Sequence, residues 1–240
     1  PDIMSRMLRR PLYSPAFLRI FLILLPLAWV SNARADGTAI LMDLEGALGV
    51  ATAEYIIDGI NTAQDQDASL IIIRMDTPGG LVEPMRDIVQ AILGSGIPVV
   101  TYVSPGGARA DSAGTYILLA SHVAAMAPTT HLGAATPVSL MGEDLSPGDV
   151  APEETGADEE TDSEEAEPTP GAPDSAMERK VLNDSISYIR GLAEAHGRNA
   201  DWAEDAVRNA ATLTATEALD QNVIDLIADN RAELLQAING

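Results

Sequence analysis

Ser112 lies in the stretch GGARADSAGTYI, where a loop with two glycines leads into an apolar helical pattern. A serine at such a boundary commonly caps the helix, because its hydroxyl oxygen accepts a backbone N–H of the first turn. The same hydroxyl can attack a carbonyl carbon when a base lies within hydrogen-bond reach and N–H donors stabilise the resulting oxyanion. Whether Ser112 is a cap or a nucleophile therefore depends on finding a base.

The histidines and the lysine of the chain are the candidate bases. His122, His131 and His196 have no spacing that by itself defines a catalytic triad, and His131 is the least unfavourable of them. The chain has thirteen arginines but a single lysine, Lys180. Arginine stays protonated in proteins, whereas burial can lower the pKa of a lysine until its amine accepts a proton. Lys180 is predicted in the first turn of a helix, where the dipole disfavours its charge, but an ion pair with Asp184 is an ordinary alternative.

A turn in the stretch MDTPGGLVEPM could supply donors for an oxyanion. Gly79 and Gly80 follow a predicted strand and precede a predicted helix. Glycine lets the backbone N–H groups of such a turn point outward, and a helix N-terminus favours negative charge. The same pattern also fits an ordinary strand-to-helix turn, so it does not identify a site on its own.

Short apolar runs alternate with helical patterns from Thr38 onward. The run LIII is apolar on both faces, as expected for a strand covered by helices on both sides of a sheet. The alternation predicts an α/β fold with right-handed crossovers and a mostly parallel sheet flanked by helices. The expected strands are residues 38–44, 69–76, 97–103 and 223–228, and the expected helices are residues 50–64, 81–93, 112–120, 202–207 and 231–238. A further helix is expected to have Lys180 in its first turn and to end at the HGRN stretch of residues 196–199, and another begins with a capping box at Thr214.

The first 35 residues have the composition of an export signal. Three arginines precede an apolar run from Ile20 to Val30, and small residues stand at Ala33 and Ala35. This order predicts cleavage after Ala35 and a mature chain on the periplasmic or extracytoplasmic face of the membrane. A retained membrane anchor is the alternative, but the apolar stretch is short for a bilayer span and Arg19 interrupts it.

Composition limits the classes of function. With 36 acidic and 14 basic residues, the net charge is -22, which argues against binding to nucleic acid. The chain has no cysteine, so disulfides, thiolate catalysis and thiolate metal sites are excluded. Residues 141–178 hold 14 acidic and no basic residues and are predicted to be a disordered excursion, either a solubilising loop or a screen at the site entrance. Residues 36–140 and 179–240 then form a single domain.

Three blocks of sequence resemble the NfeD-type membrane-associated serine peptidases of the ClpP and crotonase-like superfamily. They are MDTPGGLVEPMRDIVQAIL, ARADSAGTYI, and KVLNDSISYIRGLAEAHGRN with the LTATEALDQNVID that follows. The blocks are specific together and in this order, and the likeness runs from about Thr38 to Asn239. The resemblance implies a ClpP-like catalytic domain built of repeated ββα or βαβ units, similar in plan also to signal peptide peptidase A.

The resemblance also implies the roles of the site residues. Ser112 is expected to be the nucleophile and Lys180 the general base, with an oxyanion hole formed by the N–H of Ala113 and one from the Gly79–Gly80 turn. The histidine of ClpP itself aligns near Ala135, so this chain resembles the Ser-Lys branch. The expected activity is a serine endopeptidase without cofactor or metal, acting on hydrophobic segments of a stomatin-like membrane protein and assembling as a homo-oligomer, a dimer at least.

Two departures from the family pattern favour other functions. Asp111 stands where relatives carry a small residue, and its carboxylate could hold Lys180 protonated if it points inward. The acidic excursion is also placed between nucleophile and base. A catalytically impaired scaffold or binding module for a membrane partner is therefore the alternative, and an acyl-thioester enzyme with the same oxyanion hole is a third.

Overall fold

The computed structural model describes residues 37–138 and 176–239. From Thr38 onward these residues belong to one compact unit. The predicted export signal and all but the last three residues of the predicted acidic excursion lie outside the described residues.

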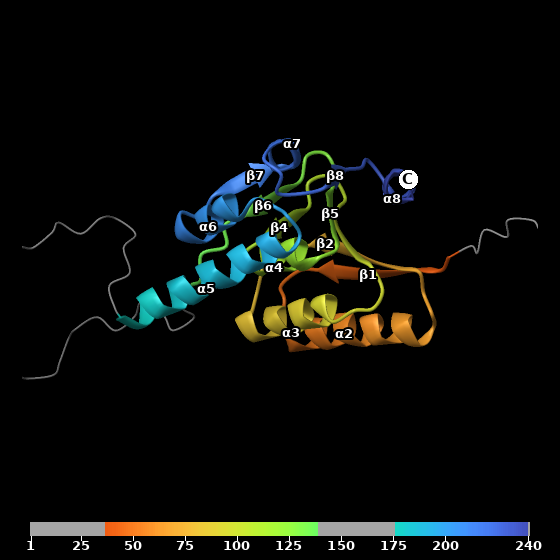
Figure 1. Ribbon diagram of the computed structural model, residues 1–240, viewed down its shortest axis with the longest axis horizontal. Helices are drawn as coiled ribbons and strands as arrows, with labels where there is room; N and C mark the ends of the chain where they lie inside the picture. The colour runs from red at the N-terminus through yellow and green to blue at the C-terminus, as the bar shows by residue number, and fades with distance from the viewer. Residues whose placement is uncertain (1–36, 139–175, 240) are drawn as a thin grey trace, which may run out of the picture. The chain divides into compact units, whose positions relative to one another are not determined.

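A five-stranded parallel sheet forms the centre of the fold. Its strand order is β1-β2-β3-β5-β8, with β1 at Ala39–Glu45, β2 at Leu70–Asp76, β3 at Val99–Val103, β5 at Val123–Met126 and β8 at Leu226–Ile227. Every neighbouring pair runs parallel, so each connection crosses over through helices. The first three crossovers contain α2 (Val50–Asp65), α3 (Val82–Leu93) and α4 (Ala113–Ala120), and α2 and α3 lie side by side on one face of the sheet (Figure 1). The α/β prediction is confirmed.

The run LIII is apolar throughout because both faces of β2 are buried. Ile71 and Ile73 enter the main core beneath the helices, where they are fully buried. Ile72 points to the opposite face and belongs to a smaller core that includes Leu234 of α8 (Arg231–Ile238). Burial of these aliphatic side chains on both faces fixes the register of the sheet.

A second, three-stranded sheet lies beside the first. It is formed by β4 (Arg109–Asp111), β6 (His131–Gly133) and β7 (Thr212–Thr214), in the order β4-β6-β7. Three residues are too few for an alternating pattern to show, which is why this sheet has no counterpart among the predicted strands. The small sheet borders the Ser112 region, because β4 ends just before Ser112 and β6 pairs with β4.

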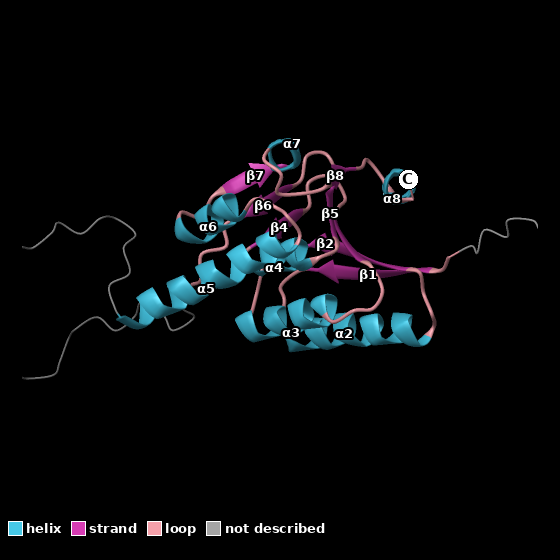
Figure 2. Ribbon diagram, viewed as in Figure 1, coloured by secondary structure: helices cyan, strands magenta, loops and turns pink. Residues whose placement is uncertain are grey.

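The C-terminal half adds α5 (Ala176–Ala195), α6 (Ala200–Arg208) and α7 (Ala215–Asp220), and α5 packs along α4 and α6 (Figure 2). α5 begins three residues inside the predicted acidic excursion, where Glu178 suits the positive end of the helix dipole. β8 is shorter than the predicted strand at 223–228, because Val223 and Ile224 still donate to the last turn of α7 through Ala218 O. No helix in the described ranges has the length and apolarity to cross a membrane.

Candidate active site

Ser112 occupies the turn between β4 and α4, at the position that would cap the helix. Its side chain makes no cap hydrogen bond, and its backbone adopts φ 52 and ψ -116. Such a conformation costs a non-glycine residue roughly 1–3 kcal/mol, and it recurs where a serine is presented on a sharp strand-to-helix turn as a nucleophile. Ser112 is therefore partly buried and does not act as a helix cap.

Small residues and a buried hydroxyl hold this turn in place. A Cβ added to Gly114 would lie 2.7 Å from Thr77 Cγ2 and 3.5 Å from Ala110 Cβ, so the helix can approach β4 only without a side chain there. The fully buried Thr115 donates through Oγ1 to Ala110 O at 2.8 Å and accepts the N–H of Gly133 at 3.1 Å. These bonds join β4 and β6 to the first turn of α4.

The Gly79–Gly80 turn lies directly against Ser112. A Cβ on Gly79, whose φ is 102, would lie 2.6 Å from Ser112 Cβ. A Cβ on Gly80 would lie 2.1 Å from Leu48 O, so no side chain fits there either. The two glycine-containing stretches that the sequence singles out are thus brought together, and close backbone approach explains both glycines.

Two backbone N–H groups beside Ser112 have no hydrogen-bond acceptor in the described parts of the chain: those of Gly80 and Ala113. Leu48 donates to Gly79 O at 2.8 Å and accepts from Leu81 N–H at 3.0 Å, so the N–H of Gly80 between them faces away from Leu48. Ala113 is the first residue of α4, where the N–H has no partner within the helix. The N–H of Gly79 is already donated to Thr77 Oγ1 at 3.0 Å, which makes Gly80 the free donor of this turn.

A cleft opens over Ser112 between α3, α4 and α5. The lining residues are Gly80, Val82, Met85, Arg86, Ser112, Ala113, Tyr116, Ala135, Pro137, Ser185 and Tyr188. Gly80, Ser112 and Ala113 all line this cleft. Ala135, where the histidine of ClpP aligns, contributes only a methyl group, and no histidine lines the cleft.

Polar and aromatic side chains of α3, α4 and α5 close one side of the cleft. The Arg86 guanidinium forms an ion pair with Asp184 and lies 4.3 Å from the centre of the Tyr188 ring, which stacks on Tyr116 at 5.9 Å. Burial raises the pKa of Tyr116 to about 12, and burial also raises the pKa of Tyr188. Both phenols are therefore protonated at neutral pH and cannot serve as the base for Ser112.

Lys180 does not lie among the cleft-lining residues. It is exposed on the second turn of α5, five residues before Ser185 and eight before Tyr188, which do line the cleft. Asp184, the residue expected as its surface partner, is engaged by Arg86. The structure thus places the single lysine on the helix that borders the cleft, with its side chain in solvent.

Asp111 points away from the cleft. Its carboxylate lies 3.4 Å from His131 Nε2 and 3.6 Å from Arg109 Nη1, both on the small sheet. The inward orientation that would hold Lys180 protonated is not observed. His131 lies beside the same carboxylate and does not line the cleft, so it offers no base to Ser112.

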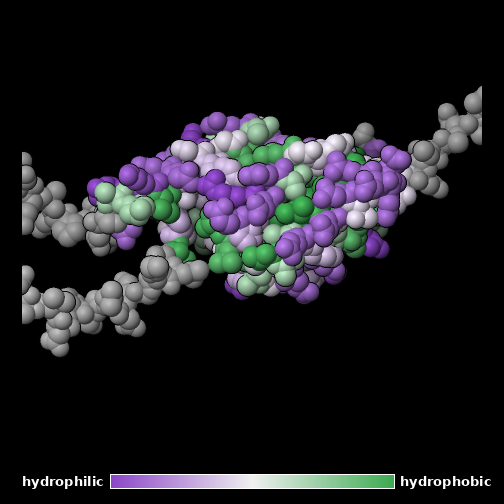
Figure 3. Space-filling view, turned by 90° about the horizontal axis from the view of Figure 1, so that it is seen from below, coloured by the Kyte–Doolittle hydropathy of each residue, from purple (hydrophilic) through white to green (hydrophobic). Residues whose placement is uncertain are grey.

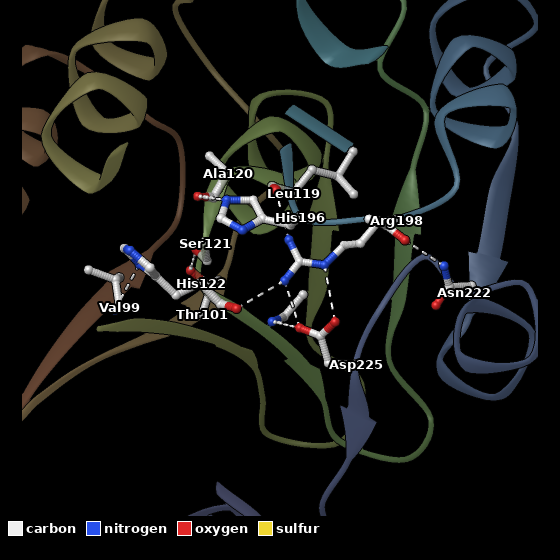
Figure 4. Close-up of polar contacts among 12 residues, drawn as sticks. Val99, Thr101, Leu119, Ala120, Ser121, His122, His196, Arg198, Asn222 and Asp225 are labelled. Atoms are coloured by element: carbon white, nitrogen blue, oxygen red, sulfur yellow. Dashed lines mark hydrogen bonds and ion pairs between the residues drawn. The ribbon is translucent and has the colours of Figure 1, made fainter. Parts of the chain in front are cut away.

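The other two histidines lie at the far end of α4, in a polar cluster around the buried Arg198 (Figure 4). Arg198 donates to Leu119 O at 2.8 Å and pairs with Asp225 at 2.6 Å, and His196 Nε2 lies 3.0 Å from Ala120 O. Cations suit the C-terminal carbonyls of a helix, so the cluster anchors the rear of α4. No sequence pattern marked Arg198, which follows a glycine in the stretch HGRN, as a buried residue.

Comparisons with known proteins identify relatives of the chain. The family described as "NfeD1b, N-terminal domain" matches residues 41–148. The membrane-bound protease PH1510 of Pyrococcus horikoshii is 36% identical over 223 residues, which are 92% of this chain and 44% of that protein. The membrane protein NfeD1b of Bacillus subtilis is 37% identical over 131 residues, which are 54% of this chain and 29% of that protein. The chain thus spans less than half the length of either relative.

Solved structures are similar over most of both chains. A serine-to-alanine mutant of the 1510-N membrane-bound stomatin-specific protease has a TM-score of 0.69 and 36% identity, covering 85% of this chain and 86% of its own. A lysine-to-alanine mutant of the same protease, solved in complex with a substrate peptide, has a TM-score of 0.69 and 35% identity, covering 86% and 82%. The chain therefore belongs to the NfeD family, and its described residues form the domain that this family shares with the 1510-N protease.

Proposed function

We propose that the chain is a serine endopeptidase that cleaves hydrophobic segments of a membrane-associated, stomatin-like protein. The observation that carries the proposal is the Ser112 turn: a strained serine without a cap bond, facing the free N–H groups of Gly80 and Ala113 in one cleft. A helix cap does not explain these features, whereas acyl transfer uses a free hydroxyl and N–H donors close together.

The reaction proceeds through an acyl-enzyme. Lys180 takes the hydroxyl proton as Ser112 Oγ attacks the scissile carbonyl. The oxyanion that forms accepts hydrogen bonds from the N–H groups of Gly80 and Ala113. The protonated amine then passes its proton to the leaving nitrogen, and water releases the acyl group from Ser112 by the reverse path.

Lys180 must leave solvent to act as this base. It is the only lysine in the chain, and relatives were studied as serine and lysine mutants, which supports the assignment. Catalytic contacts are commonly longer in free enzymes and shorten when substrate binds. We infer that a bound peptide excludes water around the first turns of α5 and that the amine then approaches Ser112.

Exposed apolar side chains around the cleft support a hydrophobic substrate. Met177 and Val181 continue the stripe of Ser185 and Tyr188 along α5 and are 69% and 45% exposed. Across the cleft, Leu81, Val82 and Val138 are also exposed. Hydrophobic surface interrupts the polar surface toward the α5 side in the view from below (Figure 3). A peptide segment of aliphatic residues would cover these side chains.

Assembly and location are part of the same proposal. The family likeness supports a homo-oligomer, a dimer at least, and the relatives are named membrane proteins. The sequence pattern of residues 1–35 supports export, with the site on the periplasmic or extracytoplasmic face.

The test is cleavage of a peptide of uncharged aliphatic residues by the purified chain, followed by mass spectrometry of the products. Wild type is expected to cut, Ser112→Ala and Lys180→Ala to lose cutting, and Ser185→Ala, a second serine of the same cleft, to retain it. Cutting that survives Ser112→Ala would contradict the proposal.

The exposure of Lys180 favours one second candidate, a binding module that holds a hydrophobic segment without cutting it. In that case the peptide binds to wild type and to Ser112→Ala with the same affinity, and no product forms with either.

A further inference from the structure

We propose that Thr77 is a positioning residue that sets the oxyanion turn and the nucleophile turn relative to each other. The inference rests on the proposed function, because it assigns Thr77 through the N–H of Gly80 and through Ser112. Thr77 is fully buried and lies immediately before the PGG turn.

The Thr77 hydroxyl determines the shape of the oxyanion turn. Oγ1 accepts the N–H of Gly79 at 3.0 Å and donates to Gly46 O at 2.7 Å. With its own N–H held in this way, Gly79 keeps its φ of 102, and the next N–H, that of Gly80, turns to the cleft. Oγ1 also lies 3.3 Å from Gly79 O, so this buried hydroxyl contacts both the N–H and the carbonyl of Gly79.

The Thr77 backbone is joined to the strand that carries Ser112. Its N–H donates to Arg109 O at 2.8 Å, and its carbonyl accepts the N–H of Asp111 at 3.1 Å. These bonds form an isolated parallel bridge between Thr77 and Ala110, two residues before Ser112. The backbone of Thr77 therefore fixes the nucleophile turn while its side chain fixes the donor turn.

The Thr77 methyl group completes the contact with α4. A Cβ added to Gly114 would lie 2.7 Å from Thr77 Cγ2, so this methyl packs against the first turn of the helix whose first N–H is the second oxyanion donor. One residue thus contacts the structures that carry Ser112, Gly80 and Ala113.

Two matched pairs isolate the hydroxyl in the 240-residue chain: wild type against Thr77→Val, and Thr77→Ser against Thr77→Ala. The probe is a fluorophosphonate, whose reaction with Ser112 develops negative charge on a phosphoryl oxygen. Loss of the hydroxyl is expected to lower the maximal labelling rate about tenfold or more in each pair, with little change in the probe concentration for half-maximal rate, because the donor is misplaced and not removed. Thr77→Ser is expected to label at a rate near that of wild type.

Thr130→Val is the control that distinguishes a positioning role of Thr77 from a purely structural one. It removes another buried hydroxyl, which donates to Ala127 O at 2.6 Å. Thr130→Val is expected to lower the melting temperature without slowing labelling. If the hydroxyl-free member of each folded pair labels as fast as its partner, the inference is wrong. If wild type itself is not labelled at Ser112, the proposed function fails, and the role of Thr77 fails with it.

Discussion

Ser112 and Thr214 are hydroxyl residues in the N-cap positions of α4 and α7, each at the end of a three-residue strand, and the two are used in opposite ways. Thr214 has φ -69 and ψ 162 and forms a complete capping box. Its hydroxyl oxygen accepts the N–H of Glu217, and its own N–H donates to the Glu217 carboxylate. Ser112 has φ 52 and ψ -116 and makes no cap bond. The N-terminus of α7 is satisfied internally, whereas that of α4 is left open.

This difference separates a stabilising feature from the one to which the proposed function assigns the chemistry. A capped N-terminus stabilises the folded chain and has nothing left to offer a ligand. An uncapped one keeps its N–H groups and its positive dipole end available to a negative group, at the cost of strain in the serine. The backbone strain of Ser112 lowers stability and its hydroxyl caps no helix, a combination that is expected at a functional site.

The largest expected effect is on reaction with a fluorophosphonate. Ser112→Ala should abolish labelling, because the attacking oxygen is absent, and Thr214→Ala should leave the rate unchanged, because its hydroxyl serves only α7. Gel fluorescence of the labelled chain measures both. Residual labelling of Ser112→Ala at the wild-type rate would mean that another residue is the nucleophile.

Replacement of the base comes next. Lys180→Ala and Lys180→Arg should slow labelling by about 10²–10⁴, since arginine keeps the charge but cannot accept a proton. The neighbouring exposed Arg179→Ala serves as the control and should label normally. Equal rates for Lys180→Ala and wild type would remove lysine from the mechanism.

Stability should change in the opposite sense. Thr214→Ala should lower the free energy of unfolding by about 1 kcal/mol, the usual loss for a helix cap. Ser112→Ala removes no cap bond and should stay within about 0.5 kcal/mol of wild type. Urea unfolding followed by circular dichroism measures both. A loss in Ser112→Ala as large as that in Thr214→Ala would show that Ser112 is a cap after all.

The smallest expected effect concerns the rear of α4. The pKa values of His122 and His196 are both lowered below 6.5. Burial is the larger cause, and the positive charge of Arg198 is the second. The unfolded chain then binds more protons than the folded chain, so this contribution to stability is complete above about pH 6.5 and is lost as the pH falls toward the folded values. His122 also accepts the N–H of Val99 on Nδ1 at 3.2 Å, a bond that protonation removes.

Urea midpoints between pH 7 and pH 5.5 measure this effect. The midpoint should fall on acidification, and His196→Gln should reduce the fall. A midpoint that rises over the same interval would contradict the assignment of the two lowered pKa values.

The sequence was most informative where a pattern repeats over many residues. Helices α2 and α3 match the prediction within a residue, because each has several turns of periodic apolar positions, and the short α8 matches it as well. The capping box at Thr214 is also confirmed, since all its atoms come from residues three apart. The contact between the Gly79–Gly80 turn and Ser112 agrees with the family likeness, although no local pattern shows it.

The remaining features depend on tertiary geometry. The φ of Ser112 is imposed by Gly133, Thr115 and the two sheets, so the sequence left cap and nucleophile open. Thr77 looks like any threonine of a strand, and only its position two residues before Gly79 hints at its role. The sequence left the surroundings of Lys180 open, because a position in the first turn of a helix disfavours its charge whereas an ion pair with Asp184 would keep it on the surface.

The most direct test of the central claim, that Ser112 is a nucleophile between two N–H donors, is a crystal structure of the phosphonylated chain. The account predicts a covalent bond from Ser112 Oγ to phosphorus, with one phosphoryl oxygen about 2.7–3.1 Å from the N atoms of both Gly80 and Ala113. An unmodified Ser112, or an adduct whose oxygens all face solvent, would contradict it.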